Sequence, residues 1–251
     1  MSLNDQQLMQ YSRQIMLPQI DVPGQEKLLA AKVVVLGAGG LGCPVLMYLA
    51  GSGIGNITVI DPDQVEISNL HRQILFHQQD IGAPKATVAA RQLSSINGDC
   101  NVTAINSLPA EQDLLDLISA ADLVIEGTDN FASRYTHNKL CIRAGTPLVS
   151  GAVIRMEGQV TCFDARQKDS PCYACLYPAA QDEHLNCTEN GVLPSVAGMI
   201  ASTMVTESIK LLTGVGESLL GRLLILDAIQ MEWRCAVSYT HLRAHETLSY
   251  L

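Results

Sequence analysis

The chain has 251 residues, of which 47% are hydrophobic and 16% are charged, and its formal net charge at pH 7 is −9. This length and composition provide material for a large core and exclude an intrinsically disordered protein. The acidic balance argues against nucleic-acid binding, because phosphate contacts require a basic face, and the small share of charged residues predicts apolar surface that an oligomer would cover.

Short β-branched runs alternate with segments of helical periodicity along the chain. An N-terminal helix is expected over residues 4–15, and Pro18, Pro23 and Gly24 are expected to end it. Strands are then expected at residues 32–36, 57–60, 122–126, 147–150, 159–163 and 222–227, and helices at residues 84–96, 111–120, 131–144 and 195–212. This alternation predicts a Rossmann-like α/β fold, a doubly wound and mostly parallel sheet with helices on both faces.

One domain is expected, because neither a repeat nor a low-complexity linker divides the chain. It covers residues 1–234, includes a polar, Cys-containing excursion at residues 164–194, and is followed by an atypical tail at residues 235–251. Residues 33–60 lack charged side chains, but Pro44 and the glycines break them into strand, turn, helix and strand, so no membrane span is expected. With no secretory signal and with cysteines that suit reduced thiols or metal ligands, a cytoplasmic location is expected.

A glycine-rich turn follows the first strand and opens a helix. Gly37, Gly39 and Gly42 form a G-x-G-x-x-G pattern, whose glycines allow close backbone approach and whose helix N-terminus favours phosphate oxygens. Asp61 ends the second strand, where an acidic residue accepts a ribose hydroxyl. The pattern predicts a nucleotide site without separating NAD from ATP, and its alternative is a turn needed only for packing.

Charged residues beyond the second and third strands favour a triphosphate. Arg72 and Lys85 offer two positive charges, which suit ATP better than the pyrophosphate of a dinucleotide. Lys85 is expected in the first turn of a helix, where the dipole disfavours a cation unless an anion lies near it. Asp129 follows the third strand and could hold Mg²⁺, while Asp129 or Asn130 could also cap the next helix.

Seven motifs in one order carry a resemblance to a known family: residues 11–15, 37–42, 61–63, 68–73, 82–85, 128–130 and 154–159. The chain resembles the ubiquitin-activating-like family that includes HesA, MoeB and ThiF, the adenylating enzymes for sulfur-carrier proteins. The resemblance covers residues ~5 to ~234. Residues 150–159 most resemble the molybdopterin-synthase adenylyltransferase branch, and the thiamine-pathway branch is close to it.

The resemblance implies an ATP-dependent adenylation. The C-terminal Gly-Gly carboxylate of a ubiquitin-like sulfur carrier, the small subunit of molybdopterin synthase, would attack the α-phosphate of MgATP and release pyrophosphate. A sulfur donor would later convert the acyl-AMP to a thiocarboxylate, in molybdenum cofactor biosynthesis or, alternatively, in the thiamine pathway. The cofactors implied are ATP and Mg²⁺, and a homodimer is expected.

The resemblance also assigns roles to single residues. Asp61 would bind the ribose, Arg72 and Lys85 the phosphates, and Asp129 the Mg²⁺. Arg13 matches an arginine of the family that reaches the ATP of the other subunit. The alternative is that Arg13 is a solvated surface residue. The full set expected at the nucleotide is Gly37, Gly39, Gly40, Gly42, Asp61, Asp63, Ser68, Asn69, Arg72, Lys85, Asp129 and Asn130.

The cysteines give a weaker signal. Cys172 and Cys175 form a C-x-x-C pair, which the resemblance assigns to half of a Cys₄ zinc site. The second pair is missing. His241 and His245 of the tail have H-x₃-H spacing, so a Cys₂His₂ site is the alternative, but a foreign or out-of-frame ending and impaired zinc binding are expected. Cys187 is either a residue that bonds to the carrier or relays sulfur, as in thiamine-branch relatives, or an unreactive loop thiol.

Two other functions compete with adenylation. An NAD-dependent oxidoreductase would explain the glycine-rich turn and Asp61, but leaves Arg72, Lys85 and Asp129 without a role. A non-catalytic half of a heterodimeric activating enzyme would be expected to lack part of the ATP-binding set, which this chain retains.

Overall fold

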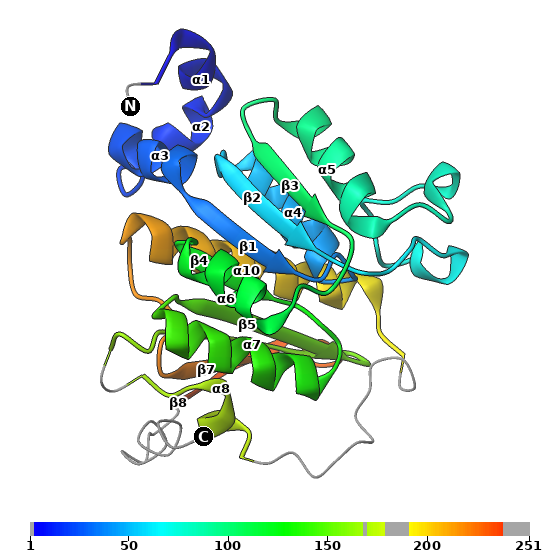
Figure 1. The fold of residues 1–251 in the computed structure, drawn as a ribbon. Coiled ribbons are helices and arrows are strands. Elements are labelled where there is room, and N and C mark those ends of the chain that lie inside the picture. The colour runs from blue at the N-terminus through cyan, green and yellow to red at the C-terminus, as the bar shows by residue number, and fades with distance from the viewer. Residues whose placement is uncertain (1–2, 168–169, 179–190, 238–251) are drawn as a thin grey trace.

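Eight strands of the computed structural model pair in one sheet, in the order β3-β2-β1-β4-β5-β6-β7-β8 (Figure 1). The structure describes residues 3–167, 170–178 and 191–237. The neighbours from β3 to β5 pair in parallel, and those from β5 to β8 pair antiparallel. The strands are β1 Lys32–Leu36, β2 Asn56–Ile60, β3 Asn101–Ile105, β4 Leu123–Glu126, β5 Leu148–Ile154, β6 Glu157–Phe163, β7 Arg222–Asp227 and β8 Glu232–Val237.

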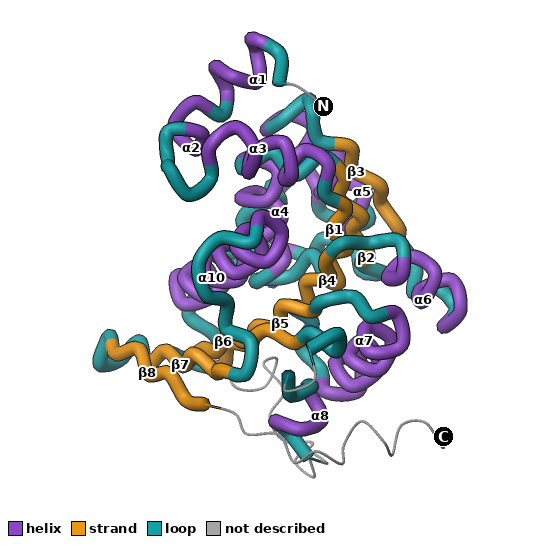
Figure 2. Tube along the Cα trace, turned by 90° about the vertical axis from the view of Figure 1, so that its left-hand side faces the viewer, coloured by secondary structure: helices purple, strands orange, loops and turns teal. Residues whose placement is uncertain are grey.

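Helices cover both faces of the sheet, and α4 and α10 lie on the side opposite α6 and α7 (Figure 2). The α-helices are α1 Asp5–Gln10, α2 Ser12–Ile15, α3 Asp21–Ala30, α4 Gly42–Gly51, α5 Lys85–Ile96, α6 Glu111–Ser119, α7 Phe131–Ala144, α8 Tyr173–Leu176 and α10 Pro194–Thr213. Short 3₁₀ turns occur at Ile67–Asn69 (η1) and Gln78–Asp80 (η2). The predicted doubly wound, mostly parallel α/β fold is confirmed.

Alternate residues of the central strands enter two separate cores. Val33 and Val35 of β1 belong to the core under α4, α5 and α10, whereas Val34 and Leu36 belong to the core under α6 and α7. This follows from the two-residue period of a strand that is covered on both faces. Each fully buried leucine, such as Leu46 of α4, contributes about 1.5–3 kcal/mol of hydrophobic free energy.

The N-terminal region differs from the prediction of one helix over residues 4–15. Asn4 caps α1 by accepting a hydrogen bond from the Gln7 backbone, and the helix breaks at Tyr11 before α2. Pro23 and Gly24 do not end a helix but lie inside α3. Pro23 is the third residue of α3, where the backbone N–H has no partner within the helix and its loss therefore costs little.

Strands β3 and β8 were not among the expected elements. β3 pairs with β2 at one edge of the sheet, and β8 pairs with β7 at the other. The expected boundary at residue 234 falls inside β8, whose pairing continues to Val237 opposite Arg222. The β7–β8 ribbon projects from one end of the sheet (Figure 2), while residues 238–251 lie outside the described residues.

In the part of the chain that the structure describes, none of the helices combines the length and the apolar character that crossing a membrane would require.

Candidate active site

A cavity of about 690 Å³ opens at the carboxyl ends of β1, β2 and β4. This is the edge of an open parallel sheet at which ligands bind, and the volume lies in the range of small-molecule sites. Of the twelve residues predicted to bind the nucleotide, all but Gly42 line the cavity: Gly37, Gly39, Gly40, Asp61, Asp63, Ser68, Asn69, Arg72, Lys85, Asp129 and Asn130.

The glycines of the glycine-rich turn have two roles, because some are required for backbone packing and others face the cavity. Gly37 has φ +93°, which favours glycine, and a Cβ on Gly42 would lie 2.0 Å from the Gly37 carbonyl oxygen. Gly42 therefore allows the helix α4 to start directly against the turn. Gly39 and Gly40 instead face the cavity, where the absence of side chains leaves room for a ligand to approach the backbone.

Asp61 fixes the glycine-rich turn to the end of β2. One carboxylate oxygen accepts a hydrogen bond from the Ala38 N–H at 2.7 Å, and the other accepts from the Asp63 N–H at 2.9 Å. Burial raises the pKa of Asp61 above its ordinary value, and these two hydrogen bonds only partly oppose this. Asp61 thus shapes the turn as well as lining the cavity.

Lys85 begins α5, and its buried ammonium lies 2.9 Å from a carboxylate oxygen of Asp63. The Lys85 N–H also donates to the Asp63 carbonyl. The anion expected beside a cation in the first helical turn is therefore supplied by the chain itself, an ion pair that the sequence pattern did not reveal. Asp63 is exposed, and Lys85 lines the cavity together with it.

Arg72 follows the η1 turn and is held by its own loop. Its Nη1 donates to the Ser68 carbonyl at 2.9 Å and lies 2.8 Å from His71 Nε2. Asn69 is buried, and its amide oxygen accepts from the Glu66 N–H while its amide nitrogen donates to the Ser68 hydroxyl. The side chain of Asn69 thus stabilises the turn that carries Arg72.

Asn130, not Asp129, caps α7, because its side-chain oxygen accepts from the Ser133 N–H at 2.8 Å. Asp129 is exposed to the cavity and forms no hydrogen bond or ion pair with another described residue. The described residues contain no cluster of three or more potential metal ligands. A lone carboxylate still fits Mg²⁺, which takes one or two carboxylates and completes its shell with phosphate oxygens and water.

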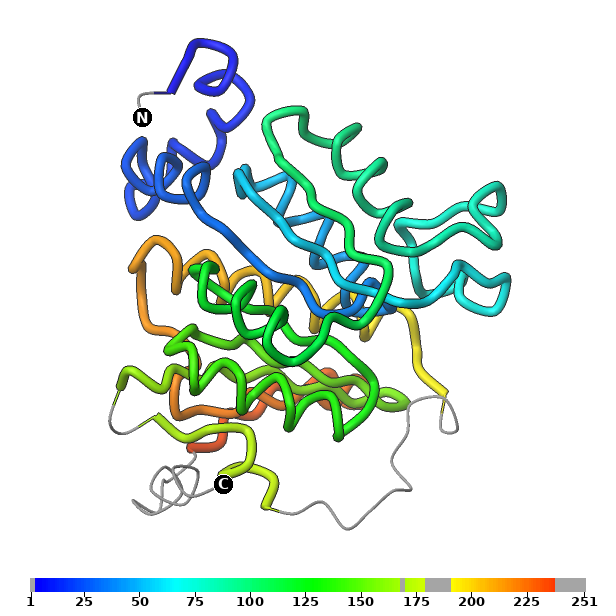
Figure 3. The backbone as a smooth tube through the Cα atoms, viewed as in Figure 1, coloured from blue at the N-terminus to red at the C-terminus, as the bar shows by residue number. Residues whose placement is uncertain are grey.

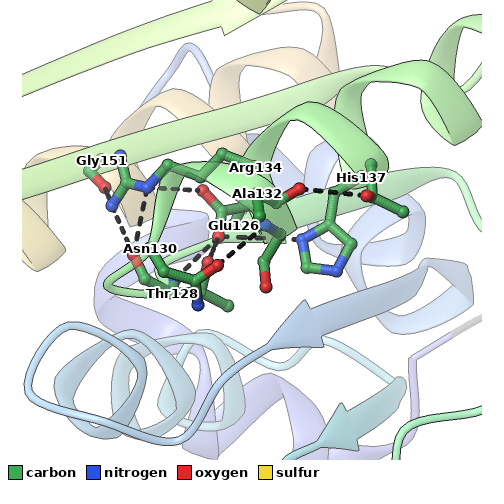
Figure 4. Close-up of polar contacts among 9 residues, drawn as sticks. Glu126, Thr128, Asn130, Ala132, Arg134, His137 and Gly151 are labelled. Carbon is green, nitrogen blue, oxygen red and sulfur yellow. Dashed lines mark hydrogen bonds and ion pairs between the residues drawn. The ribbon is translucent and has the colours of Figure 1, made fainter. Parts of the chain in front are cut away.

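A buried polar network under the Asp129 loop was missed by sequence reasoning (Figure 4). Glu126 ends β4 and is 1% exposed, and Arg134 and His137 of α7 approach its carboxylate to 3.5 Å and 3.8 Å. Burial alone would raise the pKa of Glu126, but Arg134, His137 and Thr128 outweigh it and hold the pKa below its ordinary value. An acidic residue closing an otherwise apolar strand was the available signal.

Residues 11–245 match the sequence model of the ThiF family. The chain belongs to the ThiF family. It is 42% identical over 232 residues to the molybdopterin-synthase adenylyltransferase of Escherichia coli, covering 92% of this chain and 93% of that protein. It is 40% identical over 234 residues to the sulfur carrier protein adenylyltransferase of Thermus thermophilus, covering 91% and 86%.

The solved structures support the same fold for this ThiF-family chain. The crystal structure of E. coli MccB with ATP superposes with a TM-score of 0.79 at 28% identity, covering 92% of this chain and 72% of that one.

Arg13 does not line the cavity of its own chain. It lies exposed on α2, and α3 leads directly into the amino end of β1. Figure 3 shows this N-terminal segment, in dark blue, away from the loop of residues 61–80 that borders the cavity, in cyan. The predicted contact of Arg13 with ATP therefore requires a second subunit and stays a prediction.

The described cysteines do not assemble a zinc site. Cys172 Sγ and Cys175 Sγ lie 3.4 Å apart at the start of α8, but no third potential ligand joins them among the described residues. Structural zinc requires four ligands, so this pair alone does not fit the metal. Cys187, His241 and His245 lie outside the described residues.

Proposed function

We propose that the protein is an ATP-dependent adenylyltransferase that acts on the C-terminal glycine of a ubiquitin-like sulfur carrier. The carboxylate oxygen of the carrier attacks the α-phosphorus of ATP, the bond to the bridging oxygen breaks, and carrier acyl-AMP and pyrophosphate result. The observation that carries this proposal is the shared cavity of Arg72, Lys85 and Asp129 beside the glycine-rich turn, in a chain that is 42% identical to an adenylyltransferase.

The chemistry explains why charged groups converge there. A carboxylate is a weak, anionic nucleophile, so its attack on a polyphosphate depends on alignment and charge neutralisation more than on a base. Arg72 and Lys85 would bind phosphate oxygens, and the hydroxyls of the ribose would reach Asp61. Asp129 would hold Mg²⁺, which supplies further neutralisation of the phosphates when it is bound.

The partners follow from the relatives and from the motif at residues 150–159. The carrier proposed is the small subunit of molybdopterin synthase, because that motif most resembles the molybdopterin-synthase adenylyltransferase branch; the thiamine-pathway carrier is the alternative. A homodimer would bring Arg13 of the second subunit to the ATP. A separate sulfur donor would then form the thiocarboxylate in the cytoplasm, and Cys187 is the proposed relay residue if the thiamine-pathway carrier is the substrate.

The test is to incubate the purified protein with each candidate carrier, ATP and Mg²⁺, and to measure the intact mass of the carrier. We expect one carrier to gain the mass of an AMP group with release of pyrophosphate, and the carrier that gains it identifies the pathway. The proposal fails if neither carrier is modified and no ATP–pyrophosphate exchange occurs. Thermal stabilisation by NAD but not by MgATP would instead favour an oxidoreductase.

A further inference from the structure

Thr128, the residue before Asp129, is held from two sides (Figure 4). Its backbone N–H donates to Glu126 Oε1 at 2.7 Å, and its hydroxyl donates to the same oxygen. On the other side, its carbonyl oxygen accepts hydrogen bonds from Nε, at 3.1 Å, and Nη2 of Arg134. The peptide groups on both sides of Thr128 are therefore fixed by the buried carboxylate of Glu126 and the buried guanidinium of Arg134.

Arg134 links three elements through one planar group. It extends from α7, donates from Nη2 to the Gly151 carbonyl of β5 at 3.0 Å, and forms an ion pair with Glu126 at the end of β4. Its side chain is only 8% exposed although the residue borders the cavity. Such a fork of donors is a property of guanidinium that a lysine ammonium does not reproduce.

We propose that Arg134 is a positioning residue, which together with Glu126 fixes the Thr128 peptide and so directs the Asp129 carboxylate into the cavity for Mg²⁺. This inference rests on the proposed function, because the metal role of Asp129 belongs to it. Gly127 precedes Thr128, and Asp129 has no hydrogen bond of its own to another described residue. The orientation of Asp129 thus depends on the bonds made by its neighbour.

The metal explains why such positioning matters. Mg²⁺ demands near-octahedral geometry and dehydrates reluctantly, and groups that orient a metal ligand typically contribute about 10- to 100-fold in metal affinity. Loss of Arg134 contacts should therefore weaken metal binding. Binding of ATP without metal should be unaffected, because Arg134 acts through Thr128 and Glu126 rather than on the nucleotide.

The test compares Arg134→Lys with Arg143→Lys. Arg143 lies on the same helix but forms an exposed ion pair with Glu111, so it controls for an arginine-to-lysine change on α7. Mn²⁺ binding, measured by electron paramagnetic resonance in the presence of a non-hydrolysable ATP analogue, reports the metal site without turnover. Binding of the same analogue without metal is measured by calorimetry, and thermal unfolding verifies that each variant is folded.

We expect Arg134→Lys to weaken Mn²⁺ binding about ten-fold or more, with metal-free nucleotide binding unchanged, and Arg143→Lys to change neither. Wild-type metal affinity in folded Arg134→Lys overturns the proposal, and an equal loss of metal-free nucleotide binding overturns it by showing that Arg134 contacts the nucleotide. If Arg134→Lys fails to fold, Thr128→Val serves instead: it removes the hydroxyl bond to Glu126, and unchanged metal affinity overturns the proposal. No carrier is needed, so failure of the proposed adenylation is detected separately.

Discussion

Replacing Lys85 with methionine tests whether its charge binds the phosphates of ATP or stabilises the fold. The Lys85 side chain is 7% exposed and pairs with an Asp63 side chain that is 65% exposed. An ion pair so open to solvent on one side contributes about 1 kcal/mol or less. Removing a cation from the first turn of α5 returns about 0.3–1 kcal/mol through the helix dipole. The Lys85→Met protein is therefore expected to unfold with nearly the free energy of the wild type.

The same change should have a large effect on activity. One preorganised donor to the charge that develops in a transition state is worth about 2.7–4 kcal/mol, or about 10²- to 10³-fold in rate. ATP–pyrophosphate exchange in the presence of the carrier should fall by this factor in Lys85→Met. Lys139→Met, which removes an exposed lysine of α7, is the matched control and should retain both stability and exchange.

Two results would refute this reasoning. Wild-type exchange in a folded Lys85→Met protein would show that Lys85 does not act on the phosphates. A large fall in its free energy of unfolding, measured by urea denaturation, would show that the pair with Asp63 stabilises the fold.

Arg13→Ala and Asp129→Asn homodimers should each lose pyrophosphate exchange. Dimers of one Arg13→Ala and one Asp129→Asn subunit should regain it, because one of their two sites keeps both Arg13 and Asp129. A lack of recovery after subunit mixing, or full exchange by Arg13→Ala alone, argues against an arginine supplied by the other subunit. Gly42→Ala should lower the free energy of unfolding by about 2 kcal/mol or more, because its Cβ would meet a carbonyl oxygen at 2.0 Å, while Gly51→Ala meets no atom within 4 Å and should be neutral or stabilising; equal urea midpoints would contradict this. The pKa of Glu126 is held below its ordinary 4.5. Its carboxylate therefore stabilises the fold above that pH, and this contribution is lost as the pH falls through the lower pKa of the folded state. Glu126→Gln should weaken the dependence of the free energy of unfolding on pH at acidic pH, and an unchanged slope counts against the ion pairs. Metal analysis of the purified protein should find zinc well below one ion per chain, and a full equivalent would show that residues outside the described part complete the site.

Local sequence patterns were sufficient for a central strand and for a helix that packs on the sheet. β1 and α7 occur at the predicted residues, because a buried strand and a capped helix with a C-terminal glycine each carry their own signal. The residues of β3 carry no continuous apolar run, and those of β8 are exposed throughout. Edge strands of this kind depend on a neighbour that the sequence does not identify.

The residues of the candidate site also differ in whether the sequence alone could identify them. Arg72, Lys85 and Asp129 lie in the segments that follow β2 and β4, so the sequence pattern predicted a shared site, and the structure places all three in one cavity. Glu126 and Arg134 escaped notice because their meaning comes from contacts between β4, β5 and α7. Likewise, Asp63 was identified as a nucleotide residue, whereas its pairing with Lys85 depends on how the loop after β2 folds back.

The position of β8 determines where the polypeptide tolerates shortening. A cut after residue 234 would remove Cys235, Ala236 and Val237, which pair with Leu224, Leu223 and Arg222. Half of β7 would then present unsatisfied amide and carbonyl groups next to leucine side chains, a template onto which other molecules add strands and aggregate. A truncated version of the protein should therefore end no earlier than residue 237.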